Sequence, residues 1–348
     1  MMDENTLLSV RNLTIQYVTD DGIVRAVNDV SFDIARGETM GLVGETGAGK
    51  TTTALGIMRL LPTPPSKIVG GEVYLDGRDL LKESELKMRF VRGNEVSMVF
   101  QDPMTSLNPL MTVGDQIAEV VRHHERLSRA DADARAADIL RLVGIVPERM
   151  HDYPHQFSGG MKQRVVIAMA LACNPKFLIA DEPTTALDVT IQAQVLALIG
   201  EIQKKRGTSM LMITHDLGVV AETCSKVAIM YAGQIVESGP IRSVFTNAFH
   251  PYTQGLFGSI PDINKEYERL SPIYGLMPDP VSLPPGCPFH PRCPHKMEIC
   301  DKEAPLRVMM APDHFVRCHR CTGRSGLQPQ LGVSDIDVKE GGTHAQAH

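Results

Sequence analysis

Gly44-Glu-Thr-Gly-Ala-Gly49-Lys50-Thr51 is the stretch of sequence that decides the fold. It fits the pattern G-x-x-x-x-G-K-[ST], in which backbone amides wrap phosphate oxygens, the lysine reaches the β- and γ-phosphates and the hydroxyl binds Mg²⁺. An apolar run, 38–43, precedes it, and a helical pattern, 51–61, follows it. This strand–loop–helix context makes the motif specific, because the N-terminus of a helix attracts phosphate. We expect the phosphate-binding residues to be Gly44, Glu45, Thr46, Gly47, Ala48, Gly49, Lys50, Thr51 and Thr52.

Two carboxylates end another apolar strand, Phe177-Leu-Ile-Ala-Asp181-Glu182. Asp181 at the strand tip is suited to hold the metal through a water molecule, and Glu182 is suited to polarise the attacking water as a general base. Paired acids at a strand end are often no more than a solvated turn. Beside a phosphate-binding loop they indicate a hydrolytic site.

Apolar strands that alternate with helical segments predict an α/β core with a mainly parallel sheet. The first two strand patterns, 7–17 and 24–34, are joined by a turn signal, Asp20-Asp21-Gly22, and predict an antiparallel β subdomain. A helical subdomain is expected at about 105–170. After Phe249 proline, glycine, cysteine and histidine become frequent and periodicity fades. We therefore divide the chain into a main domain, 1–248, a small cysteine-rich C-terminal extension, 249–322, and a flexible tail, 323–348.

Charge and hydropathy narrow the class of protein. The chain has 348 residues and a net charge of −6, which argues against a dedicated nucleic-acid-binding protein because neutralising phosphates needs a basic face. No apolar run approaches the roughly 20 residues that span a bilayer, and the acidic start, 1–9, lacks the pattern of a signal peptide. We expect the protein to stay in the cytoplasm and to act on a membrane only through a partner.

Further motifs separate this chain from the kinases, GTPases and helicases that share the phosphate-binding loop. Phe157-Ser-Gly-Gly-Met161, followed by Lys-Gln-Arg, resembles the signature LSGGQ-x-Q-R of the ABC ATPases, with Phe157 and Met161 in place of leucine and glutamine. The order of the other motifs strengthens the resemblance. They are Gln101 of the Q-loop, Asp188 of the D-loop, the switch histidine His215, and Tyr17, which resembles the aromatic that stacks on adenine but is also interpretable as an ordinary strand residue.

The resemblance implies an ABC-type P-loop ATPase whose site is completed by a second ATPase subunit, a copy or a paralogue packed head to tail. ATP would lie between one P-loop and the Ser158, Gly159 and Gly160 of the other subunit, with Glu182, Gln101 and His215 as the catalytic residues and Thr51, Gln101 and Asp181 at Mg²⁺. Two transmembrane permease subunits are implied as partners, docking near Gln101 and 105–143. An extracytoplasmic solute-binding protein would act indirectly.

Five of the seven cysteines crowd the C-terminal region. In a cytoplasmic chain this favours a metal site over disulfides. Thiolates there suit zinc or an iron–sulfur cluster, but the spacing matches neither a plain zinc finger nor a ferredoxin, so chemistry alone leaves zinc, iron–sulfur and unligated cysteines open. The other two, Cys173 and Cys224, lie among apolar residues and are expected in the core.

The C-terminal region resembles the tail of oligopeptide/dipeptide importer ATPases, through His250-Pro-Tyr-Thr253 and the segment from Pro285 to Cys293. Some of those proteins carry a [4Fe-4S] cluster. The resemblance therefore implies a peptide-importer ATPase at the cytoplasmic face of the membrane. It also implies cluster ligands at Cys287, Cys293, Cys300 and Cys318, with Cys321 as a substitute for Cys318.

Other functions stay open at this point. Relatives of the importer ATPases serve nickel or other small solutes. A soluble ABC ATPase acting on nucleic acid or ribosomes is less favoured, because Lys50 and Ser158 lie too close in sequence for a long coiled coil and the chain has a single cassette. A P-loop kinase would leave the Ser-Gly-Gly motif and His215 unexplained.

Overall fold

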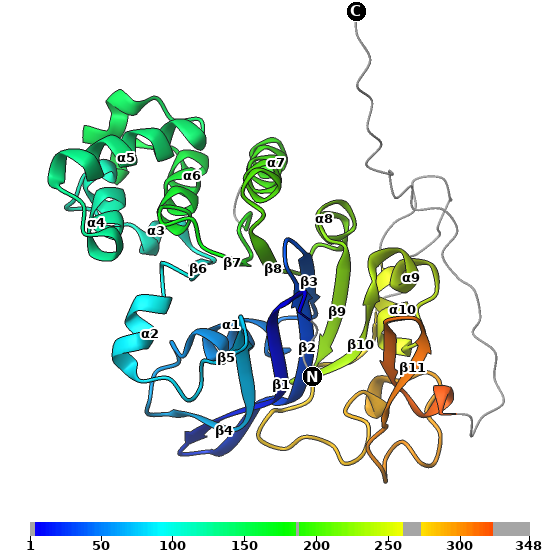
Figure 1. Ribbon diagram of the computed structural model, residues 1–348. Helices are drawn as coiled ribbons and strands as arrows, with labels where there is room; N and C mark the ends of the chain where they lie inside the picture. The colour runs from blue at the N-terminus through cyan, green and yellow to red at the C-terminus, as the bar shows by residue number, and fades with distance from the viewer. Residues whose placement is uncertain (1–3, 186–187, 260–272, 323–348) are drawn as a thin grey trace, which may run out of the picture.

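The computed structural model describes residues 4–185, 188–259 and 273–322 (Figure 1). The predicted flexible tail, 323–348, lies outside the described residues. Two β-sheets, with helices packed around them, make up most of the described part. No helix in these ranges is both long and apolar enough to cross a membrane.

The main sheet has eight strands in the order β11-β12-β10-β9-β3-β8-β7-β6. Its centre is parallel, as predicted, because β3 pairs in parallel with both β8 and β9, and β7 pairs in parallel with β8 and β6. These strands are buried on both faces and therefore read as continuous apolar runs. Their bounds are β3 Thr39–Val43, β6 Val96–Val99, β7 Phe177–Asp181, β8 Ser209–Thr214, β9 Lys226–Tyr231 and β10 Gln234–Pro240.

Successive residues of these strands enter two different cores. Phe177 and Ile179 of β7 face the core shared with the N-terminal sheet, while Leu178 and Ala180 face the core beneath the helices. This alternation follows from the period of two along a strand. The parallel register also brings Val43 beside Thr214 and Asp181 beside Ile213, so β3, β7 and β8 end at the same edge of the sheet.

The second sheet is antiparallel, in the order β2-β1-β4-β5, which confirms the predicted β subdomain. Leu8, Val10, Leu13 and Ile15 of β1 are fully buried. The strand is buried on both faces over 7–10, and the alternation of a half-buried strand is seen only over 13–16. The bounds are β1 Thr6–Thr19, β2 Gly22–Ala35, β4 Ser66–Leu75 and β5 Arg78–Asp79.

The helical subdomain groups α4, α5 and α6 on one side of the molecule, away from the β subdomain (Figure 1). The helical pattern predicted over 113–143 is interrupted, because Arg126 adopts the left-handed conformation and Ser128 caps a new helix. The short helices α2 and α3 were not predicted. The bounds are α2 Glu85–Val91, α3 Pro103–Ser106, α4 Val113–Glu125, α5 Arg129–Leu142 and α6 Gly159–Ala170, with α1 Lys50–Met58, α7 Val189–Arg206 and α8 Leu217–Thr223 along the main sheet.

The C-terminal segment continues the main sheet and core. The hairpin of β11 (Arg307–Ala311) and β12 (His314–Arg317) joins through β12 to β10, and α9 (Ile241–Thr246) and α10 (Pro251–Gly258) lie beside it (Figure 1). Cys287, Phe289 and Cys300 belong to the same core as the helical subdomain. The sequence after Phe249 shows no clear periodicity, so α10, β11 and β12 were not predicted. The domain boundary at 248 stays a prediction.

Candidate functional site

The glycine-rich loop lies between β3 and α1, at the sheet edge where β7 and β8 also end. Two of its glycines leave no room for a side chain. A Cβ on Gly44 would lie 2.2 Å from the Met230 carbonyl oxygen, and one on Gly49 would lie 2.4 Å from the Ala26 carbonyl oxygen. Gly49 also has a φ of 103°, which favours glycine. The loop is therefore fixed by close backbone approach, with the amides at the start of α1 left for an anion.

Lys50 contacts the glycine-rich loop and is 7% exposed. Its Nζ donates to the carbonyl oxygens of Gly44 at 2.7 Å and Glu45 at 3.1 Å. Burial lowers the pKa of Lys50, and the carboxylates of Glu182 and Asp181 act in the opposite direction. The ammonium group is thus held where a phosphate chain would meet it.

Asp181 is 2% exposed, and its Oδ1 has no hydrogen-bond partner among the described residues. Burial raises the pKa of this carboxyl, while a hydrogen bond with Thr51 lowers it. A buried carboxylate oxygen without a partner costs free energy unless something binds it. Together with the neighbouring hydroxyl, it offers the oxygen ligands that Mg²⁺ prefers, so these residues fit a hydrated magnesium ion.

Glu182 joins the predicted catalytic residues. Its Oε2 accepts hydrogen bonds from Gln101 Nε2 and Thr185 Oγ1, both at 2.9 Å, and its Oε1 lies 3.3 Å from Nδ1 of His215. Burial would raise the pKa of Glu182, but the hydrogen bonds from Thr185 and His215 lower it, which keeps the carboxylate ionised. The role of Thr185 was missed, although the sequence places it in the D-loop motif.

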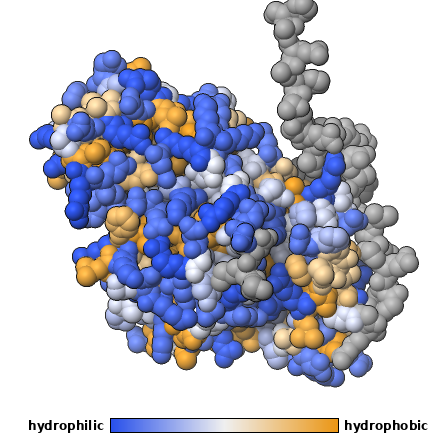
Figure 2. Space-filling view, in the orientation of Figure 1, coloured by the Kyte–Doolittle hydropathy of each residue, from blue (hydrophilic) through white to orange (hydrophobic). Residues whose placement is uncertain are grey.

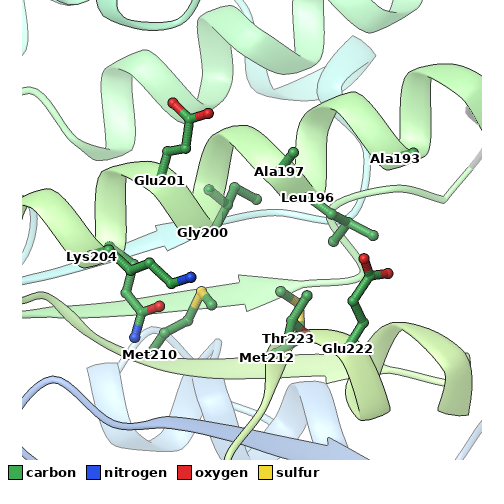
Figure 3. A pocket seen from close by; sticks show the side chains of 12 residues that line it. Ala193, Leu196, Ala197, Gly200, Glu201, Lys204, Met210, Met212, Glu222 and Thr223 are labelled. Atoms are coloured by element: carbon green, nitrogen blue, oxygen red, sulfur yellow. The ribbon is translucent and has the colours of Figure 1, made fainter. Parts of the chain in front are cut away.

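Nine of the 18 residues predicted for the nucleotide site line a cavity of about 360 Å³. Its wall includes Val24, Ala26 and Pro280, which the sequence did not indicate. The predicted residues that line it are Thr46, Gly47, Gly49, Lys50, Thr51, Thr52, Gln101, Glu182 and His215. A second cavity, of about 280 Å³, lies between α7, β8 and α8 (Figure 3). None of the predicted site residues lines it, so it is not the phosphate site.

The other nine predicted residues do not line the 360 Å³ cavity. Four of them belong to the glycine-rich loop or the end of β7, namely Gly44, Glu45, Ala48 and Asp181, and the rest are Tyr17, Ser158, Gly159, Gly160 and Asp188. Tyr17 is on β1, opposite Val24 of β2. The Ser158 hydroxyl caps α6 by accepting from the Met161 amide at 3.4 Å, and Asp188 caps α7 in the same way. A Cβ on Gly160 would lie 2.5 Å from Ile191, whereas one on Gly159 would meet nothing within 4 Å. The bare Gly159 therefore has no packing role in this chain, which suits a surface that meets another molecule.

The C-terminal cysteines lie in one region. Cys287, Cys300 and Cys318 are buried, and the Cys287 amide donates to the Cys300 carbonyl oxygen at 2.8 Å. Burial, reinforced by the neighbouring thiols, raises the pKa of Cys287 to about 12 and that of Cys293 to about 11. Yet within the described ranges no group of three or more His, Cys, Asp and Glu side chains is arranged to hold a metal ion. The observed arrangement thus does not support the predicted [4Fe-4S] ligands.

The other two cysteines are core residues, as predicted. Cys173 and Cys224 are both buried. Burial raises the pKa of Cys173 to about 11 and that of Cys224 to about 12. Both are therefore protonated and unreactive near neutral pH.

Two known families match parts of the chain. A family described as ABC transporter matches residues 27–185, and one described as oligopeptide/dipeptide transporter, C-terminal region, matches residues 236–300. The chain is 50% identical over 314 residues to the dipeptide transport ATP-binding protein DppD of Bacillus subtilis (strain 168), covering 90% of this chain and 94% of that protein. It is 48% identical over 319 residues to the oligopeptide transport ATP-binding protein OppD of Salmonella typhimurium, covering 91% and 94%.

Solved structures agree on the fold. A dimeric structure of the ATP-binding cassette MJ0796 in a post-hydrolysis state, bound to ADP and phosphate, matches with a TM-score of 0.62 at 27% identity. That match covers 68% of this chain and 99% of the cassette. CbiO1 from Clostridium perfringens, part of the ABC transporter complex cbiONQ, matches with a TM-score of 0.59 at 29% identity, covering 69% and 91%.

Proposed function

The chain belongs to the ATP-binding subunits of ABC transporters, and from that membership we propose that it hydrolyses MgATP to energise the import of dipeptides or oligopeptides. The contact of Glu182 with Gln101, Thr185 and His215 at the P-loop cavity carries the proposal, because it unites a base with the phosphate site. The peptide substrate is supported by the C-terminal family match and by relatives named for dipeptide and oligopeptide transport.

Each residue has a role in this reaction. Lys50 binds the β- and γ-phosphates and offsets their charge. Thr51 and Asp181 would hold Mg²⁺, which neutralises charge that develops on the phosphate oxygens. Glu182 takes the proton of the attacking water, with Gln101 and Thr185 fixing its carboxylate and His215 placed toward the γ-phosphate.

A second ATPase subunit completes the site in this proposal. Ser158, Gly159 and Gly160 lie outside the chain's own cavity, at the N-terminus of α6, where backbone amides and a hydroxyl suit a γ-phosphate. The dimeric structure of the matching cassette supports a pair of ATPase subunits. Whether the second subunit is a copy or a paralogue does not alter these roles.

Two transmembrane permease subunits at the cytoplasmic face of the membrane are the proposed direct partners, with a solute-binding protein acting through them. The surface is mostly hydrophilic, but apolar side chains gather over the helical subdomain (Figure 2). Leu110 there is 85% exposed, and Val146 and Tyr153 are also exposed. Exposed apolar groups on the helical subdomain suit a helix presented by a permease.

Recovery of permeases from detergent-solubilised membranes tests this proposal. The tagged protein is expected to bring down multi-span subunits, and Leu110→Glu is expected to reduce their recovery roughly tenfold, because a charge would be buried at the contact. Leu306→Glu, at a residue 75% exposed on the C-terminal segment, is the matched control. Recovery of ribosomes instead of permeases would favour the soluble class of ABC ATPase. Equal permease recovery by both variants would remove the helical subdomain as the docking surface.

Four cysteines of the C-terminal segment are the candidate ligands of an iron–sulfur cluster. We propose that Cys287, Cys293, Cys300 and Cys318 hold a [4Fe-4S] cluster. Their shared region supports this, and the arrangement of their side chains counts against it. Protein purified without oxygen is expected to be brown and to contain iron and sulfide in equal amounts. Cys293→Ser should lose both, and Cys173→Ala should keep them. Colourless protein containing zinc or no metal would overturn the proposal.

A further inference from the structure

The C-terminal segment forms part of the wall of the nucleotide cavity. Pro280 lines this cavity beside Val24 and Ala26 of β2. It is attached to β2, because the Pro280 carbonyl oxygen accepts from the Arg25 amide at 2.9 Å. The turn around it is closed by the Asp279 carboxylate, which accepts from the Val281 amide at 2.8 Å. A residue far from the P-loop in sequence is thus held at the apolar end of the cavity.

One buried arginine connects that wall to the P-loop. The Arg292 side chain is 6% exposed, and its Nη1 donates to both carboxylate oxygens of Glu45, at 3.1 and 3.2 Å. Its Nε donates to the Tyr274 carbonyl oxygen at 3.0 Å, and its Nη2 to that of Ile273 at 3.3 Å. The planar guanidinium therefore holds the P-loop and the chain that leads to Pro280 at the same time.

Glu45 is the second residue of the P-loop, and the C-terminal region holds it on two sides. Its carboxylate is bound by Arg292, and its amide donates to the hydroxyl of Tyr252 at 3.1 Å. Its carbonyl oxygen in turn accepts from Lys50. Displacement of Glu45 would therefore move the lysine that meets the phosphates.

The ion pair between Arg292 and Glu45 also changes the charge of the P-loop. A carboxylate in the P-loop repels a polyphosphate, and at short range in a partly buried site this repulsion is strong. The Arg292 guanidinium neutralises Glu45 within hydrogen-bond distance. Tyr231 also contacts the arginine: its ring centroid lies 5.7 Å from the guanidinium carbon, and its hydroxyl accepts from Nη1 at 3.4 Å.

We propose that Arg292 is a positioning residue of the nucleotide site: it neutralises and orients Glu45 of the P-loop and fixes the 273–280 stretch, so that Pro280 closes the cavity. This inference rests on the proposed function, in which the cavity binds MgATP. It assigns to the C-terminal segment a direct part in nucleotide affinity.

Titration calorimetry with MgATP on the full chain tests the charge effect. Arg292→Met is expected to weaken binding roughly tenfold, as the loss of a charge-assisted hydrogen-bond pair does. In the Glu45→Gln background the same change is expected to weaken binding less than about threefold, because the charge to be neutralised is gone. Arg317→Met is the matched control. Arg317 also ties the C-terminal segment to the β subdomain, through Asp29 at 2.6 Å, but does not line the cavity.

Two further measurements separate positioning from loss of folding. Melting temperatures without nucleotide show whether the Arg292 and Arg317 variants lose stability alike. Pro280→Gly changes an exposed residue and is expected to weaken MgATP binding roughly threefold by removing apolar contact. Equal losses of affinity from Arg292→Met in both backgrounds, or unchanged affinity in Arg292→Met and Pro280→Gly, would overturn the inference. Failure of the unmodified chain to bind MgATP would instead reject the proposed function.

Discussion

Glu182→Gln is expected to reduce ATP hydrolysis by roughly 10²–10⁴-fold, the usual contribution of a general base. The amide keeps the shape of the side chain but cannot take a proton from water. Phosphate release measured at saturating MgATP, alongside the dissociation constant for MgATP, tests this expectation. Binding should change by less than about twofold, because the phosphates are held by Lys50 and the loop amides.

The same variant should make the shared site visible. With hydrolysis blocked, ATP stays between two subunits, so size-exclusion chromatography in MgATP should show a dimer that the unmodified chain does not accumulate. Glu201→Gln, at an exposed residue of α7, is the control and should behave as the unmodified chain. Normal turnover by Glu182→Gln would remove Glu182 as the base, and a monomer in MgATP would count against the composite site.

Local sequence predicted the parts of the site that depend on local geometry. The Gly-Lys-Thr loop needs a strand before it and a helix after it, and β3 and α1 supply them. Asp181 and Glu182 follow directly from an apolar strand whose parallel pairing is implied by the alternation of strands and helices. Since parallel strands end at one edge, the meeting of these residues with Lys50 was predictable.

The remaining features depend on contacts between residues distant in sequence. Arg292 and Glu45 are 247 positions apart, and no periodicity relates them. The strands β11 and β12 were missed because β11 has no buried residue and only His314 and Val316 are buried in β12. A strand held by its pairing with β10 need not show an apolar pattern of its own. Tyr17 does not line the cavity, and its contact with adenine stays a prediction.

The carboxylate of Glu237 holds the C-terminal segment to the main sheet. Glu237 and His314 are both completely buried at the β10–β12 pairing, with Nε2 of His314 2.8 Å from Glu237 Oε1. A carboxylate only accepts, so this nitrogen carries the proton. The same carboxylate accepts from the amides of Phe249 and His250 at 2.8 and 3.0 Å. Three donors from two chain segments thus converge on one buried acceptor.

Glu237→Gln is expected to lower the free energy of unfolding by about 3 kcal/mol, because an amide has fewer acceptor sites and its NH₂ group would face buried donors. Urea denaturation followed by circular dichroism measures the loss. Glu201→Gln, at an exposed glutamate with a single 3.8 Å pair to Lys205, should cost less than about 0.5 kcal/mol. A loss no larger than that control would show that the buried contacts contribute little.

The number of transitions in the urea denaturation curve of Glu237→Gln tests the predicted domain boundary at 248. If the C-terminal segment unfolds with the core to which it contributes Cys287 and Phe289, the Glu237→Gln curve should shift as one cooperative transition. If the segment were an independent unit, the variant would release it first, and a second transition at the unmodified midpoint would remain. One shifted transition would therefore mean that the C-terminal segment and the nucleotide-binding core unfold as one cooperative unit. This is expected of a segment that supplies part of the nucleotide cavity.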